Sequence, residues 1–446
     1  MSAPALTQSP ELEGFRGLLR FAADPLGSLE EARRLHGPFV SYRQSRGNVR
    51  LVFDPELVDE LMVGGADHII KDEFTRQLKP VMGEGLLTNE GQPWKKQRKL
   101  LAPSFQPKHL QAYARVMVDC AEAMVDHLRG GGVRSIHADM MHLTLEVVVR
   151  TLFGGSVVRA DEVERLLDQV TSDYRRLLMS WRAAFPGWFP FYSRIRFGRA
   201  RKQLRKVIDE LISERRRAPP GNDMLSRLLE AKDDAGRGMS EQQLLDEAIT
   251  VLIAGHETTA LALCYALDQL ARHPTELTVL ERELAEVLAG RSPRFEDVPR
   301  LRYCGAVVKE TLRLYPPAWA TGREVVTELT LGGVKLPPGT LLLVSPWVVQ
   351  RDARFFREPL RFRPDRWLNG ETDGLPKLAY FPFGAGPRVC IGSHFAELEA
   401  ALLLATLTSR CTFSLTSEAP LLLSPSVTLR PRGPMEMRVV VRDGPS

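Results

Sequence analysis

The chain of 446 residues has little cysteine, little excess charge and no long apolar run. Its 5 cysteines are odd in number and scattered, which favours a reducing compartment over a secreted, disulfide-stapled domain. No uninterrupted apolar segment approaches the roughly 18 to 20 residues that a bilayer-spanning helix needs. The first residues lack the basic-then-apolar order of a signal peptide. We therefore expect a cytoplasmic protein without a transmembrane anchor.

The sequence also lacks the features that mark boundaries between domains. The sequence has no low-complexity tract, no internal repeat and no linker rich in proline, glycine and serine, so one domain over 1–446 is expected. A net charge of +5 is too small to indicate nucleic-acid binding. The Gly-x-Gly pairs at 83–85 and 384–386 lack the strand–turn–helix setting of a dinucleotide fingerprint. No fused reductase domain is therefore expected.

Most long segments of the sequence show the apolar periodicity of helices. Residues 241–272 form the clearest helix, which Ser240 and Gln243 open as a capping box and His273-Pro274 ends. At 1.5 Å per residue this helix is about 48 Å long, and its apolar centre predicts burial. Further helices are predicted over 274–290 and 302–314, and strands near 40 and over 51–53, 340–345 and 437–442. The pattern predicts a mainly α fold with small β-sheets, of the α+β class.

A cysteine surrounded by glycines precedes the last long apolar helical run. The segment reads Phe381-Pro-Phe383-Gly384-Ala-Gly386-Pro-Arg388-Val-Cys390-Ile-Gly392. Because glycine accepts positive φ and close backbone approach, this bend can turn N–H groups toward a thiolate. Cys390 is therefore the candidate ligand of a haem iron. A cysteine that merely packs has no need of these glycines, whereas Cys120, Cys264, Cys304 and Cys411 are expected to pack as small core residues.

The spacing Phe383-x-x-Gly386-x-Arg388-x-Cys390-x-Gly392 resembles the signature of the cytochrome P-450 family at every defining position. The resemblance covers roughly residue 82 to the C-terminus. It implies haem b with Cys390 as thiolate ligand, held between the long central helix and the Cys-ligand loop and helix. Thiolate ligation favours O–O cleavage. The resemblance thus implies a monooxygenase that inserts one atom of O2 into a C–H or C=C bond of an apolar terpenoid, polyketide or fatty-acyl-like molecule, in bacterial secondary metabolism.

Ala254-Gly-His256-Glu257-Thr258-Thr lies in the middle of the 241–272 helix. Ala254 and Thr258 share a face, and threonine can bond back to the carbonyl one turn earlier, which distorts a helix and leaves a groove for dioxygen. The segment resembles the family's oxygen-activation motif, in which the acid-alcohol pair, here Glu257 and Thr258, relays protons to dioxygen. His-Glu-Thr-Thr-Ala is not His-Glu-x-x-His, so zinc is disfavoured. A plain buried Thr-Thr step is the alternative, and His256 is expected to pack between helices.

Buried haem propionates need cations or N–H donors. Trp94 and Arg98 lie on one face of a predicted helix and match a haem-contact motif of the family, while Arg388 and Arg323 match further contacts. The cofactor-binding residues that the resemblance implies are therefore Trp94, Arg98, Arg323, Arg388, Ala254 and Phe383.

Glu310 and Arg313 have the i, i+3 spacing that joins a carboxylate and a guanidinium on a helix. The resemblance places them with Arg366 in a buried structural triad that holds the ligand loop. One departure from the family is visible. Gln350-Arg-Asp replaces the common His-Arg-Asp, which leaves the iron chemistry intact but gives no prediction for the local packing.

The resemblance also implies redox partners. Lys95, Lys96 and Lys99 would suit docking of an acidic ferredoxin or flavodoxin, reduced by an NAD(P)H-dependent reductase, although an ordinary solvated helix face explains them equally well. A monomer is expected. By position in the family, apolar segments would line the substrate pocket: 66–85, 181–197, 248–254, 318–321 and 424–427. The aromatic run at 185–192 suits a packed loop, a lid or a membrane-touching patch.

Two other functions stay open at this point. A haem-thiolate isomerase, dehydratase or peroxygenase would keep Cys390 but normally lose the Glu257–Thr258 pair. A haem sensor without turnover would need no proton relay.

Overall fold

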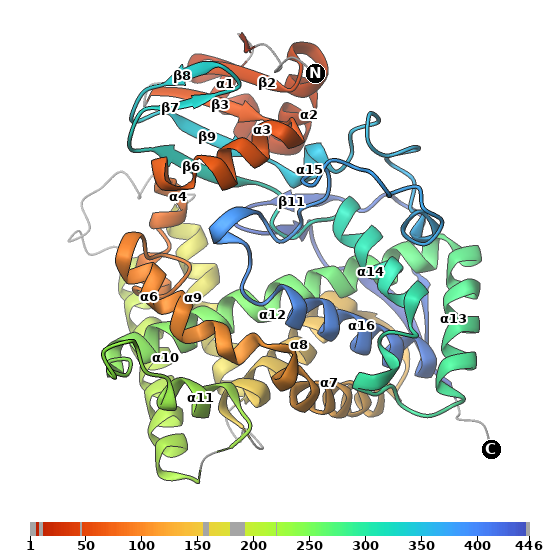
Figure 1. Ribbon diagram of the computed structural model, residues 1–446. Coiled ribbons are helices and arrows are strands. Elements are labelled where there is room, and N and C mark those ends of the chain that lie inside the picture. Colours follow the sequence, from red (N-terminus) through yellow and green to blue (C-terminus); the bar gives the residue numbers. More distant parts are fainter. Residues whose placement is uncertain are drawn as a thin grey trace. The chain divides into compact units, whose positions relative to one another are not determined.

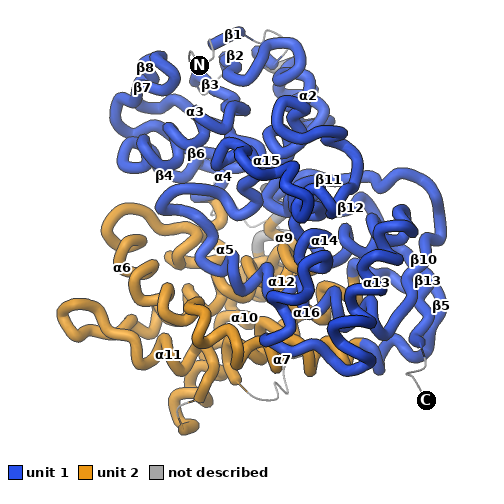
Figure 2. The backbone as a smooth tube through the Cα atoms, turned by 45° about the vertical axis from the view of Figure 1, so that its right-hand side comes forward, with its two compact units in different colours: residues 1–76, 125–137, 261–446 blue, residues 77–124, 138–260 orange. Residues whose placement is uncertain are grey.

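The computed structural model describes residues 6–8, 12–44, 47–154, 160–178, 192–219 and 221–442, and these form a mainly helical backbone with small sheets (Figure 1). The predicted α+β class is confirmed. Most of the predicted pocket segment 181–197, including all but the last residue of the aromatic run, lies outside the described residues. The chain forms two compact units (Figure 2): unit 1 is Met1–Arg76, Val125–His137 and Leu261–Ser446, and unit 2 is Gln77–Met124 and Ala138–Ala260.

Unit 1 contains the sheets and many short helices. Its helical elements are α1 (Gly14–Ala23), α2 (Pro25–His36), α3 (Pro55–Asp59), the π-helical turn η2 (Glu60–Gly64), η3 (Ala66–His68), α4 (Glu73–Arg76), α13 (Pro274–Leu288), η6 (Phe295–Asp297), α14 (Arg302–Leu314), α15 (Pro346–Val349), η7 (Pro364–Trp367), η8 (Gly386–Arg388) and α16 (Ser393–Arg410). Its strands are β1 (Thr7–Gln8), β2 (Phe39–Gln44), β3 (Gly47–Val52), β4 (Ile69–Lys71), β5 (Gly132–Ser135), β6 (Thr321–Val325), β7 (Leu329–Leu331), β8 (Val334–Leu336), β9 (Leu341–Val344), β10 (Cys411–Leu415), β11 (Leu423–Pro425), β12 (Leu429–Pro431) and β13 (Glu436–Val441).

The largest sheet of unit 1 has the order β1-β2-β3-β9-β6-β4. β3 and β9 pair in parallel, with Leu51 opposite Leu343, and β6 runs antiparallel to β9. Alternate residues of β9 are buried, so the sheet presents one apolar face. That face belongs to a core cluster that includes Phe39, Leu51 and Phe381. The core therefore holds the first residue of the predicted ligand loop.

The remaining sheets are small. β10, β13 and β5 pair antiparallel, with Phe413 opposite Val439, while β11 pairs with β12 and β7 with β8. The strands predicted near 40 and over 51–53, 340–345 and 437–442 are confirmed, with ends shifted by one to a few residues. Shifts of this size are normal at strand ends, because the last residues of a strand make few ladder hydrogen bonds.

Unit 2 is helical in its described part. Its elements are α5 (Lys79–Met82), α6 (Gly91–Leu101), η4 (Ala102–Phe105), α7 (Pro107–Leu128), α8 (Ile136–Phe153), α9 (Ala160–Leu178), α10 (Tyr192–Arg217), α11 (Met224–Glu230) and α12 (Glu241–Arg272). The ends of α7 and α12 and the start of α8 belong to unit 1.

The long helix α12 has the bounds that the sequence predicted. The Ser240 hydroxyl accepts the N–H of Gln243 at 3.2 Å, and Pro274 follows the last turn. Among the described residues, only α12 is long and apolar enough to cross a membrane, but 72% of its most apolar stretch is buried in the structure. Burial in the core accounts for that apolarity.

The cysteines divide as predicted. Cys120, Cys264, Cys304 and Cys411 are buried, and Cys390 is exposed. Burial raises the pKa of the Cys120 thiol to about 12 and raises that of Cys304 as well. These two thiols are therefore protonated at neutral pH and are poor metal ligands.

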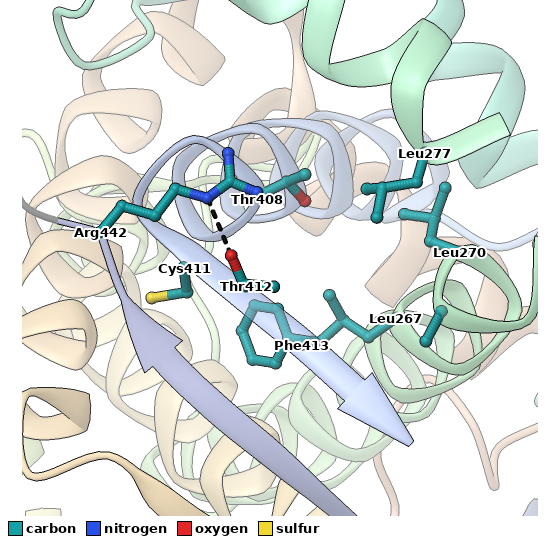
Figure 3. A pocket seen from close by; sticks show the side chains of 9 residues that line it. Leu267, Leu270, Leu277, Thr408, Cys411, Thr412, Phe413 and Arg442 are labelled. Carbon is teal, nitrogen blue, oxygen red and sulfur yellow. Dashed lines mark hydrogen bonds between the residues drawn. The ribbon is translucent and has the colours of Figure 1, made fainter. Parts of the chain in front are cut away.

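A small cavity lies in unit 1 between the second half of α12 and β10 (Figure 3). Leu267, Leu270 and Phe413 line it, and Arg442 closes one side through a 3.0 Å hydrogen bond from Nε to the Thr412 hydroxyl. Its volume of about 10 Å³ leaves room for no more than one water molecule. This cavity is therefore too small to be a substrate pocket.

Candidate active site

The cysteine loop of unit 1 is a compact hairpin that begins at Phe381. The N–H of Cys390 donates to the carbonyl of Phe383 at 2.9 Å, and that of Val389 donates to Gly386 at 3.0 Å. These bonds set Phe383 beside Cys390 across the hairpin. Cys390 is exposed and Phe383 is half-buried.

The cysteine directly precedes a helix N-terminus. α16 begins at Ser393, whose N–H donates to the Cys390 carbonyl at 3.4 Å. The first N–H groups of a helix have no acceptor within it and carry the positive end of the helix dipole. Both features stabilise a negative charge held at this end of a helix.

Two glycines of the loop have positive φ for different reasons. Gly384 has φ 76° with open space where a Cβ would lie. Gly386 has φ 66°, and a Cβ there would lie 1.9 Å from the carbonyl oxygen of Met62 in η2. Gly384 thus serves only the turn, whereas Gly386 also lets the loop lie against the backbone of η2.

This difference yields a prediction. Gly386→Ala adds a backbone clash to the strain of positive φ, so we expect it to lower the free energy of unfolding by about 2–5 kcal/mol. Gly384→Ala, the matched control, should cost only the strain, about 1–2 kcal/mol. Denaturant titration of both variants measures the difference. Equal losses would contradict the close approach to Met62.

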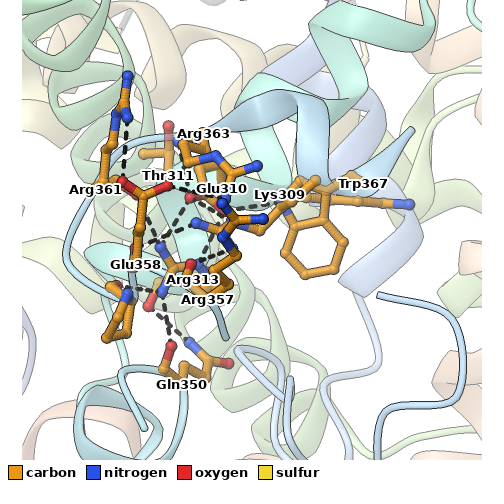
Figure 4. Close-up of polar contacts among 12 residues, drawn as sticks. Lys309, Glu310, Thr311, Arg313, Gln350, Arg357, Glu358, Arg361, Arg363 and Trp367 are labelled. Atoms are coloured by element: carbon orange, nitrogen blue, oxygen red, sulfur yellow. Dashed lines mark hydrogen bonds and ion pairs between the residues drawn. The ribbon is translucent and has the colours of Figure 1, made fainter. Parts of the chain in front are cut away.

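The triad that the resemblance implied is present, and Figure 4 shows two of its members, Glu310 and Arg313. Arg313 donates to Glu310 through Nε at 2.9 Å and Nη2 at 2.8 Å, and Arg366 donates through Nε at 3.1 Å. All three side chains are fully buried. Burial lowers the pKa of Arg366, and Glu310 acts in the opposite direction. Buried charges persist only when they are paired in this way.

Three members of this cluster were missed by sequence reasoning. The indole of Trp367 and the N–H of Arg363 donate to Glu310 at 2.9 and 3.0 Å, and Glu371 accepts from Arg366 Nη1 at 2.6 Å. Their proximity to Arg366 in the sequence was the available signal. The Glu310 carboxylate thereby receives donors from α14 and from the segment around η7.

The centre of α12, in unit 2, carries the predicted alcohol. The Thr258 hydroxyl donates to the Ala254 carbonyl at 2.9 Å, as predicted. The helix nevertheless continues as α-helix through this point, so the expected distortion does not interrupt it. Ala254 is exposed and Thr258 half-buried, whereas Glu257 is buried. A mostly buried helix thus presents a small residue and a hydroxyl on an accessible face.

The residues beside this pair have packing roles. His256 is buried, its Nδ1 lies 2.7 Å from the Leu252 carbonyl, and its own carbonyl accepts the Thr144 hydroxyl at 2.9 Å. The prediction of a helix-packing histidine is confirmed. A Cβ on Gly255 would lie 3.1 Å from Val148 of α8. The absence of a side chain at Gly255 therefore lets α8 pack closely against α12.

A family model described as cytochrome P-450 matches residues 14–437. The chain belongs to the cytochrome P-450 family. Cyclooctatin synthase of Streptomyces melanosporofaciens is 36% identical over 84% of this chain and 83% of the relative. Cyclooctat-9-en-7-ol 5-monooxygenase of the same species is 34% identical over 84% and 82%, and pentalenene oxygenase of Streptomyces avermitilis is 32% identical over 84% of each chain. The chain is thus a haem-thiolate monooxygenase that carries haem b.

Two arginines of this cytochrome P-450 fit the carboxylates of haem. Arg323 on β6 is 7% exposed and donates to the neutral oxygens of Thr321 and Gly322 at 3.0 and 2.7 Å. Burial lowers its pKa to about 10, against the opposing charge of Asp72. Burial also lowers the pKa of Arg388 to about 10. Arg323 is buried and Arg388 half-buried, and an anion relieves the cost of removing such cations from water, so both sites suit a propionate.

The other predicted propionate contacts lie together on α6. Trp94 is buried, and the guanidinium of Arg98 lies 5.8 Å from the centre of its ring. The predicted common face is confirmed.

The structure brings predicted pocket segments together in pairs. In unit 2, the N–H groups of Glu84 and Leu86 donate to the carboxylates of Asp246 and Glu247, both at 2.9 Å, which fastens the end of 66–85 beside the start of 248–254. In unit 1, the indole of Trp319 donates to the Ser426 carbonyl at 2.9 Å and joins 318–321 to 424–427. The carboxylates at 246 and 247 were not singled out in the sequence, where they resemble an ordinary helix start.

The predicted basic patch is partly neutralised within unit 2. Lys96 pairs with Asp233 at 2.8 Å and Lys99 with Asp234 at 2.6 Å. The hydrogen bond from Lys96 holds the pKa of Asp233 well below its usual range. The acids lie more than 130 residues further along the chain, so no local pattern around the lysines indicated these pairs.

Proposed function

We propose that this cytochrome P-450 oxidises an apolar terpenoid-like substrate in bacterial secondary metabolism. The names of its relatives support the substrate class, since one is a monooxygenase of cyclooctat-9-en-7-ol, one an oxygenase of pentalenene and one a synthase of cyclooctatin. The observation that carries the oxidation is the Thr258 hydroxyl on the accessible face of α12, in the residue that follows Glu257. An isomerase, a dehydratase, a peroxygenase or a sensor would not need this acid-alcohol pair.

Each site residue has a proposed role. Cys390 is the iron ligand, and Ala254 and Phe383 contact the porphyrin. Trp94, Arg98, Arg323 and Arg388 hold the propionates through N–H groups and positive charge. When bound, the haem supplies the iron at which dioxygen is activated. We further propose a single-domain, monomeric, cytoplasmic enzyme.

The chain itself contributes the handling of protons. In this structure the Thr258 hydroxyl donates its hydrogen to the Ala254 carbonyl. Rotation about the Cα–Cβ bond would free that hydrogen for another acceptor, and Glu257 would pass on protons from solvent. The two residues therefore act in series, Glu257 as the supplier and Thr258 as the final donor.

Thr258→Ala should uncouple the enzyme. Haem loading and substrate affinity should stay nearly unchanged, while product per reduced cofactor falls, because loss of a positioned proton donor typically slows the assisted step by about 10²-fold. The ratio of product formed to reduced cofactor consumed measures this effect. Glu257→Gln should instead slow turnover as a whole.

Thr259 offers a matched control for Thr258. It is the next residue of α12, it is buried, and its hydroxyl makes the corresponding bond to the Gly255 carbonyl at 3.3 Å. Thr259→Val should keep the wild-type ratio. If Thr258→Ala keeps it too, with dioxygen as oxidant, the proton-relay role is wrong.

Two assays test the substrate and the reaction class. Cyclic terpene hydrocarbons should give the largest low-to-high-spin change of the Soret band in a panel that includes fatty acids and polyketide-like esters. Stronger changes with fatty acids would exclude the proposed substrate class. Turnover that needs only hydrogen peroxide would favour a peroxygenase over the proposed oxygenase.

The electron donor is proposed to be an acidic ferredoxin or flavodoxin with an NAD(P)H-dependent reductase. Because Lys96 and Lys99 already have acidic partners, their reversal to glutamate should slow reduction by no more than about fivefold at low salt. Reversal of Arg216, which pairs with Glu241 at 2.9 Å, is the control. Stopped-flow reduction at several salt concentrations measures both. Rates indifferent to salt and to the lysines would contradict docking at α6.

A further inference from the structure

Gln350, which follows α15, contacts two separate parts of unit 1. Its Nε2 donates to the carbonyls of Leu312 and Arg313 at 3.0 and 3.1 Å, and its Oε1 accepts the N–H of Phe381 at 2.8 Å. A backbone carbonyl only accepts and a backbone N–H only donates, so these partners fix the orientation of the amide. The side chain is 0% exposed, and bulk water does not compete for its bonds.

One end of this bridge is the C-terminus of α14. The last carbonyls of a helix have no donor within it, and Gln350 serves two of them. The backbone carbonyl of Gln350 also accepts Nη1 of Arg313 at 2.8 Å (Figure 4). Residue 350 is thus joined to the helix and to the guanidinium that binds Glu310.

The other end is the start of the cysteine loop. The carbonyl of Phe381 accepts the N–H of Gly384 at 2.9 Å, and its ring packs in the core cluster that also contains Met62 and Ala385. The N–H that Gln350 binds therefore belongs to the residue from which the hairpin to Cys390 departs.

We propose that Gln350 is a positioning residue that sets the place of the Cys390 loop relative to the Glu310–Arg313–Arg366 triad. The inference rests on the proposed role of Cys390 as haem ligand. The bridge needs two donors and one acceptor on a single side chain, which the glutamine amide supplies. A neutral histidine has one donor and one acceptor and cannot make all three bonds.

The test uses the haem-loaded enzyme and a near-isosteric variant, Gln350→Met. We expect the Phe381 amide to exchange hydrogen about fivefold faster, the factor that loss of one typical hydrogen bond gives. We also expect a smaller fraction of the reduced carbonyl complex to absorb at about 450 nm, because that band reports thiolate ligation. Thr311→Val is the matched control: its buried hydroxyl donates only to Val307 within α14, at 2.8 Å, so both readouts should stay at wild-type values.

The outcomes separate cleanly. Faster exchange at Phe381 with an unchanged 450 nm fraction would overturn the positioning role, as would equal effects of Gln350→Met and Thr311→Val. If Gln350→Met does not fold, hydrogen exchange at the Phe381 amide of the wild-type protein is measured instead. Rapid exchange there would exclude the bridge, and slow exchange would support it. Failure of the proposed haem ligand shows differently: the band would survive Cys390→Ser, while exchange at Phe381 would still respond to Gln350→Met.

Discussion

Cys390→Ser should abolish the absorption of the reduced carbonyl complex at about 450 nm, because that band depends on thiolate donation to iron and a serine hydroxyl stays protonated. This is the largest spectroscopic change that we expect from any single substitution in the chain. The fold should survive, since Cys390 is exposed and its N–H bond to Phe383 does not involve the side chain. Circular dichroism and the reduced carbonyl spectrum of the purified variant check both statements.

Cys411→Ser is the control for this experiment. Cys411 is a buried cysteine at the start of β10, and its replacement should leave the band in place. A 450 nm band in Cys390→Ser would show that another residue ligates the iron.

Glu310→Gln should give the largest loss of stability. The carboxylate receives bonds from Arg313, Arg366, Arg363 and Trp367 in a fully buried site. Glutamine keeps the shape but removes the negative charge, and it turns an N–H2 group toward donors. Breaking a buried ion pair by removal of one partner costs about 3–5 kcal/mol. Denaturant titration followed by circular dichroism measures the change.

Glu371→Gln separates charge from burial. Glu371 binds the same Arg366 guanidinium at 2.6 Å, but its side chain is 21% exposed, and water can replace part of the interaction. We expect a cost of about 1 kcal/mol. If the two glutamine variants lost equal stability, burial of the triad would not explain its strength.

Local signals predicted the helices well. Ser240 and His273-Pro274 gave both ends of α12, because caps and prolines act on their immediate neighbours. The triad was also accessible, since Glu310 and Arg313 lie one turn apart and the resemblance supplied Arg366. In each case the information lay within one helix or one motif.

Contacts between distant segments were not predictable in this way. No motif around Gly386 predicts its contact with the Met62 carbonyl, and no motif around Lys96 predicts its ion pair with Asp233. Gln350 departs from the family pattern, so the resemblance gave no partner for it, and Phe381 lies 31 positions away. Such contacts depend on the final packing and leave no periodic trace in the chain.

The close contact of Gly386 with the backbone of η2 has a consequence for the order of folding. The loop and the Met62 carbonyl are separated by more than 300 residues, so their contact closes a loop that contains most of the chain. Contacts of such long sequence separation form late, because the entropy of a large loop must be lost first. The cysteine loop therefore reaches its final position only after the segment that ends with η2 at residue 64 has folded against it. We expect cofactor capture to be among the last events of maturation, and amino-terminal truncations to yield chains that are translated but remain colourless.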